Sequence, residues 1–276
     1  MKSNPSDPCG PEGHIVRLLE EARPRFSRLA ARVRHFDTIG STNDEALSWT
    51  ANAAAQRSSA EGFVVVADRQ TAGRGRRGHT WFSPPGAGLY VSVVLAPRTA
   101  RIDPRRATML TTLAAGVAVA EGIEAAAGLR IDLKWPNDLF ASRRKLAGIL
   151  AESAADDLVV VGYGINIAAT ALPAELRERA TSLESELGRA VDRAPVLVET
   201  VAALARRYDD LLGGRFNAIL DAWRGRAPAA TGARVSWTTN AGPRSGLTAG
   251  IDDDGALLVE VDDRIERVVA GELAWQ

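Results

Sequence analysis

The sequence predicts an α+β fold, in which a mixed sheet flanked by helices is followed by a small β-barrel. Strand-length apolar runs and helical patterns both occur up to about residue 226. Past Ala227-Pro228 the pattern changes to short strands separated by turns. The chain has 276 residues, of which 46% are hydrophobic and 25% are charged, enough for one large and one small packed domain. We therefore expect a tail at residues 1–12, a first domain at 13–226 and a second at 229–276.

The N-terminal part begins with residues 1–12, which carry three prolines and are expected to be disordered. Apolar residues recur at helical spacing over residues 14–33, where Pro24 divides the pattern into two short helices. The next helix is expected to begin at Ser41 or Thr42, since each has an acidic residue three positions on, the spacing of a capping box.

The middle of the chain combines buried strands with one long helix. The run Val64-Val65-Val66 is typical of a strand that is buried on both faces. Asp103-Pro104 predicts a helix start, because Asp is a good N-cap and proline fits the first turn. Segments 146–153 and 158–167 are joined near Asp156-Asp157 and predict a hairpin. The expected elements, in order, are two short helices within 14–33, a strand at 33–36, a helix from 41 or 42 to about 55, strands at 63–68 and 89–95, a helix from 104 to about 127, strands at 131–135, 146–153 and 158–167, helices at 196–212 and 215–224, and short strands at 234–238, 244–251, 256–261 and 266–270, with turns of the type Asn240-Ala241-Gly242 and Asp253-Asp254-Gly255 between the last four.

The composition excludes several classes of protein. The 34 basic and 34 acidic residues give no net charge, so a surface built for nucleic acid is not expected and DNA is not an expected partner. A single cysteine, Cys9, excludes internal disulfides and Cys-rich metal sites, and the three histidines are scattered. No apolar run reaches the length of a membrane span, and the N-terminus lacks the pattern of a signal peptide. We therefore expect a cytoplasmic protein without a membrane partner.

The loop Gly73-Arg74-Gly75-Arg76-Arg77-Gly78 is the most informative segment. It follows a strand and fits the G-x-G-x-x-G pattern, but the dinucleotide fingerprint also needs a helix directly afterwards and an acidic residue about 20 positions on. Pro84-Pro85-Gly86 excludes that helix, and Arg98 and Thr99 stand where the acid should be. The glycines allow close approach to a ligand, and the arginines suit carboxylate or phosphate. The loop predicts an anion site; a solvated basic turn and a nucleic-acid contact are the alternatives.

The segment Lys134-Trp135-Pro136-Asn137-Asp138 ends a predicted strand. Pro136 is expected to stop the strand and to display Asn137 and Asp138 at its tip. Lys134 suits a phosphate, and Asp138 suits a magnesium ion or a lysine amine, whereas a plain turn is the alternative. Lys145 stands at the entrance of an apolar strand, from which its ammonium can reach a pocket.

Two residues on the predicted hairpin complete the candidate set. Gly148 inside a strand suggests close approach of another group, and Asn166 can read a base edge or satisfy backbone groups. No cluster holds a Ser-His-Asp set or a cysteine with a base, so a covalent enzyme intermediate lacks a nucleophile. Cations and amides remain, which are Arg74, Arg76, Arg77, Lys134, Lys145, Asn137 and Asn166. They suit a reaction that holds negative charge, such as attack of a carboxylate on a nucleotide phosphate.

Four segments, in this order, resemble those of the biotin protein ligases. They are Ser41-Thr42-Asn43, residues 70–83 from Gln70-Thr71-Ala72 to Trp81-Phe82-Ser83, the Lys134–Asp138 segment with Arg144-Lys145-Leu146-Ala147-Gly148-Ile149-Leu150, and Gly164-Ile165-Asn166. The resemblance covers about residues 35–276. It implies a catalytic domain like that of class II aminoacyl-tRNA synthetases and an SH3-like C-terminal barrel.

The resemblance implies a reaction in two steps. The carboxylate of biotin attacks the α-phosphate of Mg²⁺·ATP and gives biotinyl-5′-AMP and pyrophosphate. A lysine of a biotin carboxyl carrier domain, from acetyl-CoA carboxylase or a related biotin enzyme, then attacks the mixed anhydride. Biotin, ATP and Mg²⁺ are thus the expected ligands. Because an acyl adenylate hydrolyses readily, the site has to exclude water, and a loop that orders on binding would do so.

Roles are carried over from the family motif by motif. The expected biotin or adenylate contacts are Ser41, Thr42, Asn43, Gln70, Gly73, Arg74, Gly75, Arg76, Lys145 and Gly148. The expected nucleotide contacts are Arg74, Arg76, Arg77, Trp81, Lys134, Asn137 and Asn166. The expected catalytic groups are Arg76, Lys134, Asp138 and Lys145. No residue is assigned as a metal ligand. In these roles the loop closes over the intermediate, Lys145 steadies the carboxylate and the phosphate, and Asp138 orients or deprotonates the acceptor lysine.

The sequence departs from the family's pattern in two places. The part before about residue 35 does not match the winged helix-turn-helix of bifunctional members, so a monofunctional enzyme without repressor activity is expected. Residues 168–193 show no match to the tryptophan-bearing adenine loop of some members, which leaves the adenine contact unassigned. A lipoate or octanoate ligase or transferase, and a non-catalytic biotin-sensing DNA regulator, are the competing hypotheses. Some relatives pair sheets edge to edge, so a homodimer remains an alternative to a monomer.

Overall fold

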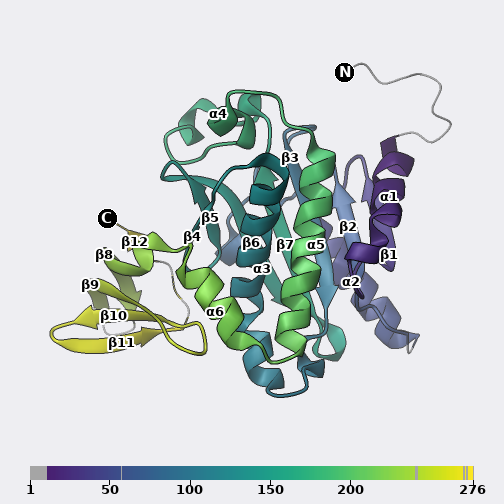
Figure 1. The fold of residues 1–276 in the computed structure, drawn as a ribbon. Helices are drawn as coiled ribbons and strands as arrows, with labels where there is room; N and C mark the ends of the chain where they lie inside the picture. The colour runs from purple at the N-terminus through teal and green to yellow at the C-terminus, as the bar shows by residue number, and fades with distance from the viewer. Residues whose placement is uncertain (1–10, 57, 240–241, 270, 272, 276) are drawn as a thin grey trace.

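The computed structural model describes residues 11–56, 58–239, 242–269, 271 and 273–275 (Figure 1). We expected a tail at residues 1–12. Residues 1–10 of this segment lie outside the described ranges. Pro11 and Glu12 belong to the first helix, α1 (Pro11–Glu21). Of the turn expected at Asn240-Ala241-Gly242, the first two residues also lie outside them.

A seven-stranded mixed sheet forms the centre of the larger part of the molecule. Its strands follow the order β1-β2-β3-β7-β6-β5-β4, with β1 and β2 parallel and every other neighbouring pair antiparallel. The strands are β1 (Arg32–Phe36), β2 (Phe63–Ala67), β3 (Gly88–Leu95), β4 (Asp132–Lys134), β5 (Asp138–Ala141), β6 (Arg144–Ser153) and β7 (Val159–Asn166). The expected hairpin at 146–167 is therefore confirmed, and so is the mixed sheet of an α+β fold.

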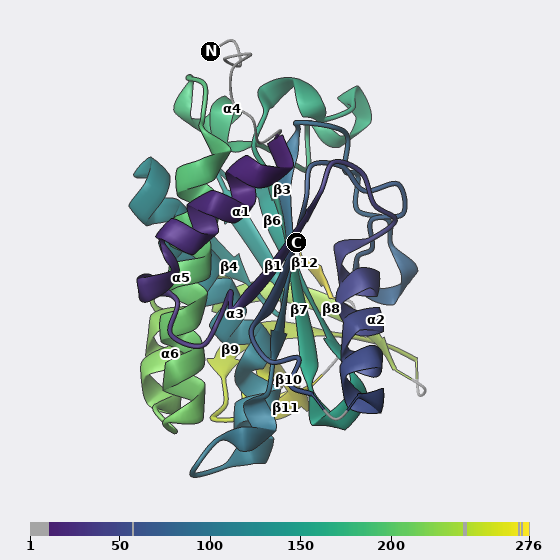
Figure 2. The same ribbon diagram turned by 90° about the vertical axis from the view of Figure 1, so that its right-hand side faces the viewer.

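Helices cover both faces of this sheet. The long helices α3 (Pro104–Ala127) and α5 (Arg193–Leu212) pack against each other on one face, as Figure 1 shows, and α2 (Thr42–Ala55) lies on the other face, as Figure 2 shows. Two shorter helices, α4 (Leu183–Leu187) and α6 (Phe216–Arg224), and several single 3-10 turns complete this part. Asp103 caps α3 by accepting a hydrogen bond from the Arg106 amide at 2.9 Å, as the sequence predicts.

The valine-rich strand β2 explains how one sheet serves two cores. Successive side chains of a strand point to opposite faces. Val64 and Val66 accordingly join the large core with α3 and α5, whereas Phe63 and Val65 join a smaller core with Ala46 and others of α2. All five residues of β2 are buried, as expected of a continuous apolar run.

A five-stranded antiparallel sheet forms the C-terminal part, in the order β11-β10-β9-β8-β12. Its strands are β8 (Thr231–Thr239), β9 (Gly242–Ile251), β10 (Leu257–Val261), β11 (Arg264–Val268) and β12 (Ala274–Trp275). Between β9 and β10 the Gly255 amide donates to the Asp252 carbonyl at 3.1 Å, so the expected turn there is confirmed. The small sheet meets the large one where Trp135 Nε1 donates to the Gly255 carbonyl at 2.9 Å.

The structure corrects three expectations about local elements. The Ser41 side chain makes no capping hydrogen bond although Ser41 is the N-cap of α2. The strand stops before Pro136 and Asn137 lies in the turn, as expected, but Asp138 is not displayed beyond the strand, because it pairs with Lys134 as the first residue of β5. The helix α3 is long and apolar enough to cross a membrane, although no such run was expected, but 67% of its apolar window is buried inside the protein, as in a core helix.

Candidate active site

A cavity of about 530 Å³ opens on the sheet face that carries α2. It lies over β5, β6 and β7 and is covered by the glycine loop and by the last residues of the chain. Its lining includes one carboxylate, that of Asp138, among the described residues. The cationic lining residues are Arg74, Arg76, Arg77, Lys134, Lys145 and Arg179. The charge of the lining therefore favours anionic ligands.

The glycine loop folds back on itself as a short hairpin. The Gly75 amide donates to the His79 carbonyl at 2.6 Å, and the Trp81 amide donates to the Gly73 carbonyl at 2.9 Å. The hairpin tip is a single 3-10 turn at Arg76–Gly78, in which Arg77 adopts a φ of 55°. The tip thus presents two adjacent arginines at the cavity, and no helix follows it, as expected.

Glycines on the central strands make the cavity floor. A Cβ atom at Gly164 would lie 2.4 Å from Trp81 Nε1, and one at Gly162 would lie 2.0 Å from Asn43 Oδ1. Either contact is impossible without displacement, so these positions need glycine for space. They let the Trp81 ring pack directly on the sheet, where its Nε1 is buried and has no hydrogen-bond partner among the described residues.

Two lysines flank Asp138 on the floor. Lys145 Nζ lies 2.7 Å from Asp138 Oδ1 and 5.4 Å from the centre of the Trp81 ring. Lys134 Nζ lies between two aromatic rings, 4.9 Å from the centre of Phe140 and 5.1 Å from that of Trp275. Burial and the charge of Lys145 lower the pKa of Lys134, while Asp138 opposes the shift. An anion that enters here would therefore stabilise the charged form of Lys134.

Arg76 reaches from the loop tip to the floor. Its Nη1 donates to Asn137 Oδ1 at 3.2 Å, and Asn137 Nδ2 donates to the Ile149 carbonyl at 2.7 Å. Burial and the neighbouring Arg77 lower the pKa of Arg76, and Asp138 opposes the shift. A guanidinium in this position has too little opposite charge nearby, which suits the binding of an anionic ligand.

Hydroxyl and amide groups, several of them buried, form another part of the cavity wall. Gln70 Oε1 accepts from the Thr42 amide at 2.8 Å and from Thr42 Oγ1 at 3.1 Å, and Gln70 Nε2 donates to Ser83 Oγ at 3.1 Å. Asn43 Oδ1 accepts from Ser92 Oγ at 2.5 Å. This wall lies at the start of α2 and suits the polar ring of a small neutral head group.

The structure brings most of the expected site residues to the cavity. Ser41, Thr42, Asn43, Gln70, Arg74, Gly75, Arg76, Arg77, Trp81, Lys134, Asn137, Asp138, Lys145 and Gly148 line it. Gly73 does not line it, but it lies so close to the returning strand of the loop that a Cβ there would be 2.5 Å from the Trp81 carbonyl oxygen. Asn166 is buried outside the lining, where its Nδ2 donates to the Thr181 carbonyl at 3.0 Å. That contact matches the alternative of satisfying backbone groups.

Two parts of the lining were not expected. Leu176 and Arg179 come from residues 168–193, where the sequence showed no family motif. Leu273 and Trp275 come from the C-terminal end, which is far away in sequence. The residues next to Leu273 and Trp275 in the sequence do not indicate that these side chains line a cavity, so only the three-dimensional fold reveals this position.

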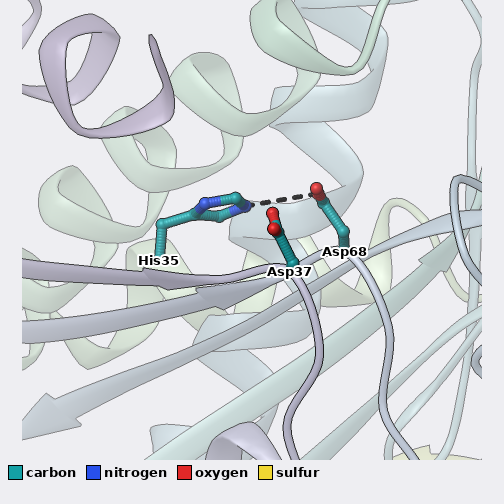
Figure 3. A group of neighbouring side chains, drawn as sticks. All are labelled: His35, Asp37 and Asp68. Carbon is teal, nitrogen blue, oxygen red and sulfur yellow. Dashed lines mark ion pairs between the residues drawn. The ribbon is translucent and has the colours of Figure 1, made fainter. Parts of the chain in front are cut away.

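A separate polar cluster lies where β1, β2 and α5 meet. His35 Nε2 lies 3.3 Å from Asp68 Oδ1 (Figure 3). Arg193 Nη1 lies 2.8 Å from the same oxygen. Burial acts to raise the pKa of Asp68, but His35 and Arg193 together hold this pKa below its ordinary value. Asp37 completes a group whose possible metal-ligand atoms lie within 4.8 Å of one another. The guanidinium beside Asp68 disfavours a cation, so we assign the cluster to joining β1, β2 and α5.

Comparisons with known proteins agree with this geometry. The sequence profile of the biotin/lipoate A/B protein ligase family matches residues 37–166, and that of the biotin protein ligase C-terminal domain matches residues 232–273. The bifunctional ligase/repressor BirA of Bacillus spizizenii is 37% identical over 86% of this chain and 72% of its own length. The biotin--[acetyl-CoA-carboxylase] ligase of Mycobacterium tuberculosis is 35% identical over 87% of this chain and 88% of its own.

A solved structure gives the same result. The biotin protein ligase from Aquifex aeolicus, in complex with biotin and ATP, superposes with a TM-score of 0.76 at 27% identity. It covers 89% of this chain and 99% of its own chain. The large mixed sheet and the small C-terminal sheet thus have counterparts in one known enzyme. Together with the identity to curated ligases over most of their length, these matches show that the chain belongs to the biotin protein ligase family.

Proposed function

We propose that the cavity under the glycine loop binds biotin and ATP side by side and that its cations carry out the adenylation of biotin. The observation that carries the proposal is the charge of the lining, with six cationic side chains around the single carboxylate of Asp138 among the described residues. The protein is an ATP-dependent biotin protein ligase, because its relatives of known name and its structural neighbours are biotin ligases. These names favour biotin over the lipoate or octanoate alternative.

In the first step a carboxylate oxygen of biotin attacks the α-phosphorus of ATP. The bond to the bridging oxygen of pyrophosphate breaks, and biotinyl-5′-AMP and pyrophosphate form. Two anions have to approach each other, so the site has to offset their repulsion. Lys145 is proposed to bridge the carboxylate and the α-phosphate; its ammonium lies 2.7 Å from Asp138 Oδ1 and can exchange that partner for an anionic ligand.

The wall at the start of α2 is the proposed site for the ureido ring of biotin. Thr42 and Gln70 line the cavity and supply neutral donors and acceptors, and Ser92 supports Thr42 from behind. Thr42 and Ser92 are almost completely buried. Neutral, pre-arranged polar groups bind a neutral ring without the loss of solvation that a buried charge would cause. The carboxylate end of biotin then points toward Lys145 and the loop tip.

The cations nearer the C-terminal sheet are the proposed nucleotide contacts. Lys134 and Arg76 have pKa values below their ordinary ones because they are buried near other cations. Triphosphate oxygens would supply the missing negative charge. The buried Nε1 of Trp81 lacks a partner, so an acceptor on a ligand would also satisfy it. Mg²⁺ is expected to enter with the phosphates, because it is usually held by one or two carboxylates plus substrate phosphates, and Asp138 offers one.

In the second step the ε-amine of an acceptor lysine attacks the acyl carbon of biotinyl-AMP, and AMP leaves. The amine has to lose a proton, and Asp138 is the carboxylate that the lining offers for it. The acceptor is proposed to be a biotin carboxyl carrier domain, as the name of the Mycobacterium tuberculosis relative implies for that protein. The reaction supplies no role for a membrane, and a cytoplasmic location is proposed.

The test is biotin-dependent exchange of radioactive pyrophosphate into ATP, because the first step is reversible and needs no acceptor. We expect exchange with biotin and Mg²⁺, and much slower exchange with lipoate or octanoate at equal concentration. Exchange with lipoate or octanoate but not with biotin would refute the assignment of the pocket. A carrier domain added afterwards should accept biotin on a single lysine, which mass spectrometry can locate.

A further inference from the structure

Glu152, on β6, joins the glycine loop to the polar wall of the pocket. Its two carboxylate oxygens accept hydrogen bonds from the two Nη atoms of Arg74, each at 2.8 Å. Its Oε2 also accepts from Asn43 Nδ2 at 2.7 Å. A second acid, Asp44, lies 2.6 Å from Arg74 Nη2 but is more than half exposed. The guanidinium of Arg74 is thus already engaged by protein carboxylates, which makes it an anchor of the loop.

The hydrogen bonds continue from Glu152 into the pocket wall. Asn43 Oδ1 lies 2.5 Å from Ser92 Oγ, and Ser92 Oγ lies 2.8 Å from Thr42 Oγ1. Thr42 Oγ1 in turn donates to Gln70 Oε1 at 3.1 Å. Asn43, Ser92 and Thr42 are all less than 5% exposed. Water therefore has little access to these groups, and each has to find its partners within the protein.

The charge of Glu152 sets the direction of these hydrogen bonds. An ionised carboxylate only accepts, and so does the Leu150 carbonyl, which lies 3.3 Å from Asn43 Nδ2 on the same side. The amide of Asn43 therefore turns its Nδ2 toward Glu152 and its Oδ1 toward Ser92. Ser92 then donates its single proton to Asn43 Oδ1, so its contact with Thr42 Oγ1 needs the Thr42 proton, for which Gln70 Oε1 is the second acceptor. The carboxylate of Glu152 thereby orders the Asn43 amide and the Ser92 hydroxyl that support the wall of the pocket.

We propose that Glu152 is a positioning residue of the ligase reaction, which fixes the polar wall through Asn43 and the glycine loop through Arg74. The inference rests on the proposed placement of biotin against that wall. A single change at Glu152 should consequently weaken the binding of biotin and loosen the loop over the adenylate, whereas a change at Asp44 affects only the anchor of Arg74.

The experiment compares the full-length wild type with Glu152→Gln, and Asp44→Asn serves as the matched control. Both substitutions remove a charge at nearly constant volume. Glu152→Gln should raise the KM for biotin about tenfold or more, as expected for the loss of hydrogen bonds to a charged group. It should leave the KM for ATP within about twofold, and it should speed the release of biotinyl-AMP. Asp44→Asn should leave the KM for biotin within about twofold of the wild type.

Three outcomes would overturn the inference. In the first, Glu152→Gln keeps wild-type constants for biotin and for adenylate release. In the second, Glu152→Gln only melts at a lower temperature, with unchanged kinetics below its melting point. In the third, Asp44→Asn changes the KM for biotin as much as Glu152→Gln does. Wild-type exchange is measured first, and if biotin supports none, the proposed function of the pocket fails and the inference fails with it.

Discussion

The ammonium of Lys145 and the carboxylate of Asp138 lie 2.7 Å apart on neighbouring antiparallel strands, β6 and β5. Lys145 is one residue before the apolar part of β6, so its stem is held by the sheet while its charge faces the cavity. The pair keeps the ammonium in place before an anionic ligand arrives. It also keeps the only carboxylate of the described lining next to the position proposed for the reacting carboxylate.

Replacing Lys145 by Ala should remove most of the pyrophosphate exchange. A pre-arranged charged donor at the reacting centre is typically worth about 10²- to 10³-fold in rate, and we expect a loss in this range. Arg144→Ala is the matched control, because Arg144 is the adjacent cation but points away from the cavity and pairs with Glu186 at 2.9 Å. Near-normal exchange by Lys145→Ala, or an equal loss in both variants, would contradict the placement.

Replacing Arg76 by Gly should make the adenylate escape. Arg76 spans from the loop tip to Asn137 on the floor, so its loss opens the lid side of the cavity. Released biotinyl-AMP would then react with lysines of unrelated proteins, and streptavidin blots should show labelling of added albumin. The control is Arg76→Gly/Lys145→Ala, which forms too little adenylate to label anything. Selective labelling of the carrier alone, with wild-type retention of adenylate, would show that Arg76 does not close the site.

The sequence predicted those parts of the fold that local patterns determine. The cap at Asp103, the buried strand β2 and the hairpin of β6 and β7 depend on residues that are close in the chain, and all three were found. Five of the six lining cations were also predictable, because they lie in short segments rich in Gly, Pro, Arg and Lys, whereas Arg179 comes from a segment without such a pattern. The hairpin at Pro136 was misjudged, since the sequence does not show that β5 pairs back onto β4.

Contacts between distant residues were beyond prediction. Glu152 and Arg74 are 78 residues apart, and nothing near either residue indicates the other. Trp275 reaches Lys134 only because the small sheet docks on the large one through Trp135 and Gly255. From the sequence alone, a tryptophan that packs on a cation looks the same as one that packs in an apolar core. Which of the two occurs depends on tertiary packing.

Trp275→Ala should weaken ATP binding more than biotin binding. The Trp275 ring covers one side of the Lys134 ammonium. Removal of the ring would let water reach this ammonium. Such a cation–π contact is worth roughly 0.5–2 kcal/mol, so we expect the KM for ATP to rise about threefold to thirtyfold. Leu247→Ala is the control, since Leu247 is exposed on β9 of the same sheet and does not line the cavity. A change in the KM for biotin alone would contradict this role.

The alkaline limb of the exchange rate should depend on Lys134. Burial and Lys145 lower the pKa of Lys134 below its ordinary value, while Asp138 opposes the shift. The ammonium is therefore present at low pH and is lost, on raising the pH, earlier than that of an exposed lysine. Exchange should fall at that point. Lys134→Arg should extend the activity to higher pH, because a guanidinium stays charged. Identical alkaline limbs for the wild type and Lys134→Arg would show that another group sets them.

Gly164→Ala tests the floor of the cavity against a matched glycine in the core. At Gly164 the new methyl group would lie 2.4 Å from Trp81 Nε1, and the nearest atoms are those of a buried ring that packs on the sheet. The ring has to move into the cavity, so the KM for ATP should rise at least about tenfold while the chain still folds. Gly116→Ala is the control, because Gly116 lies inside α3 and its methyl group would meet only Leu133 of β4 at 3.7 Å, an ordinary contact. Alanine is the better helix former there, so the free energy of unfolding should increase by up to about 1 kcal/mol with unchanged kinetics. Denaturant titration and exchange kinetics on both variants measure these effects, and wild-type constants for Gly164→Ala would mean that Trp81 is not fixed by the floor.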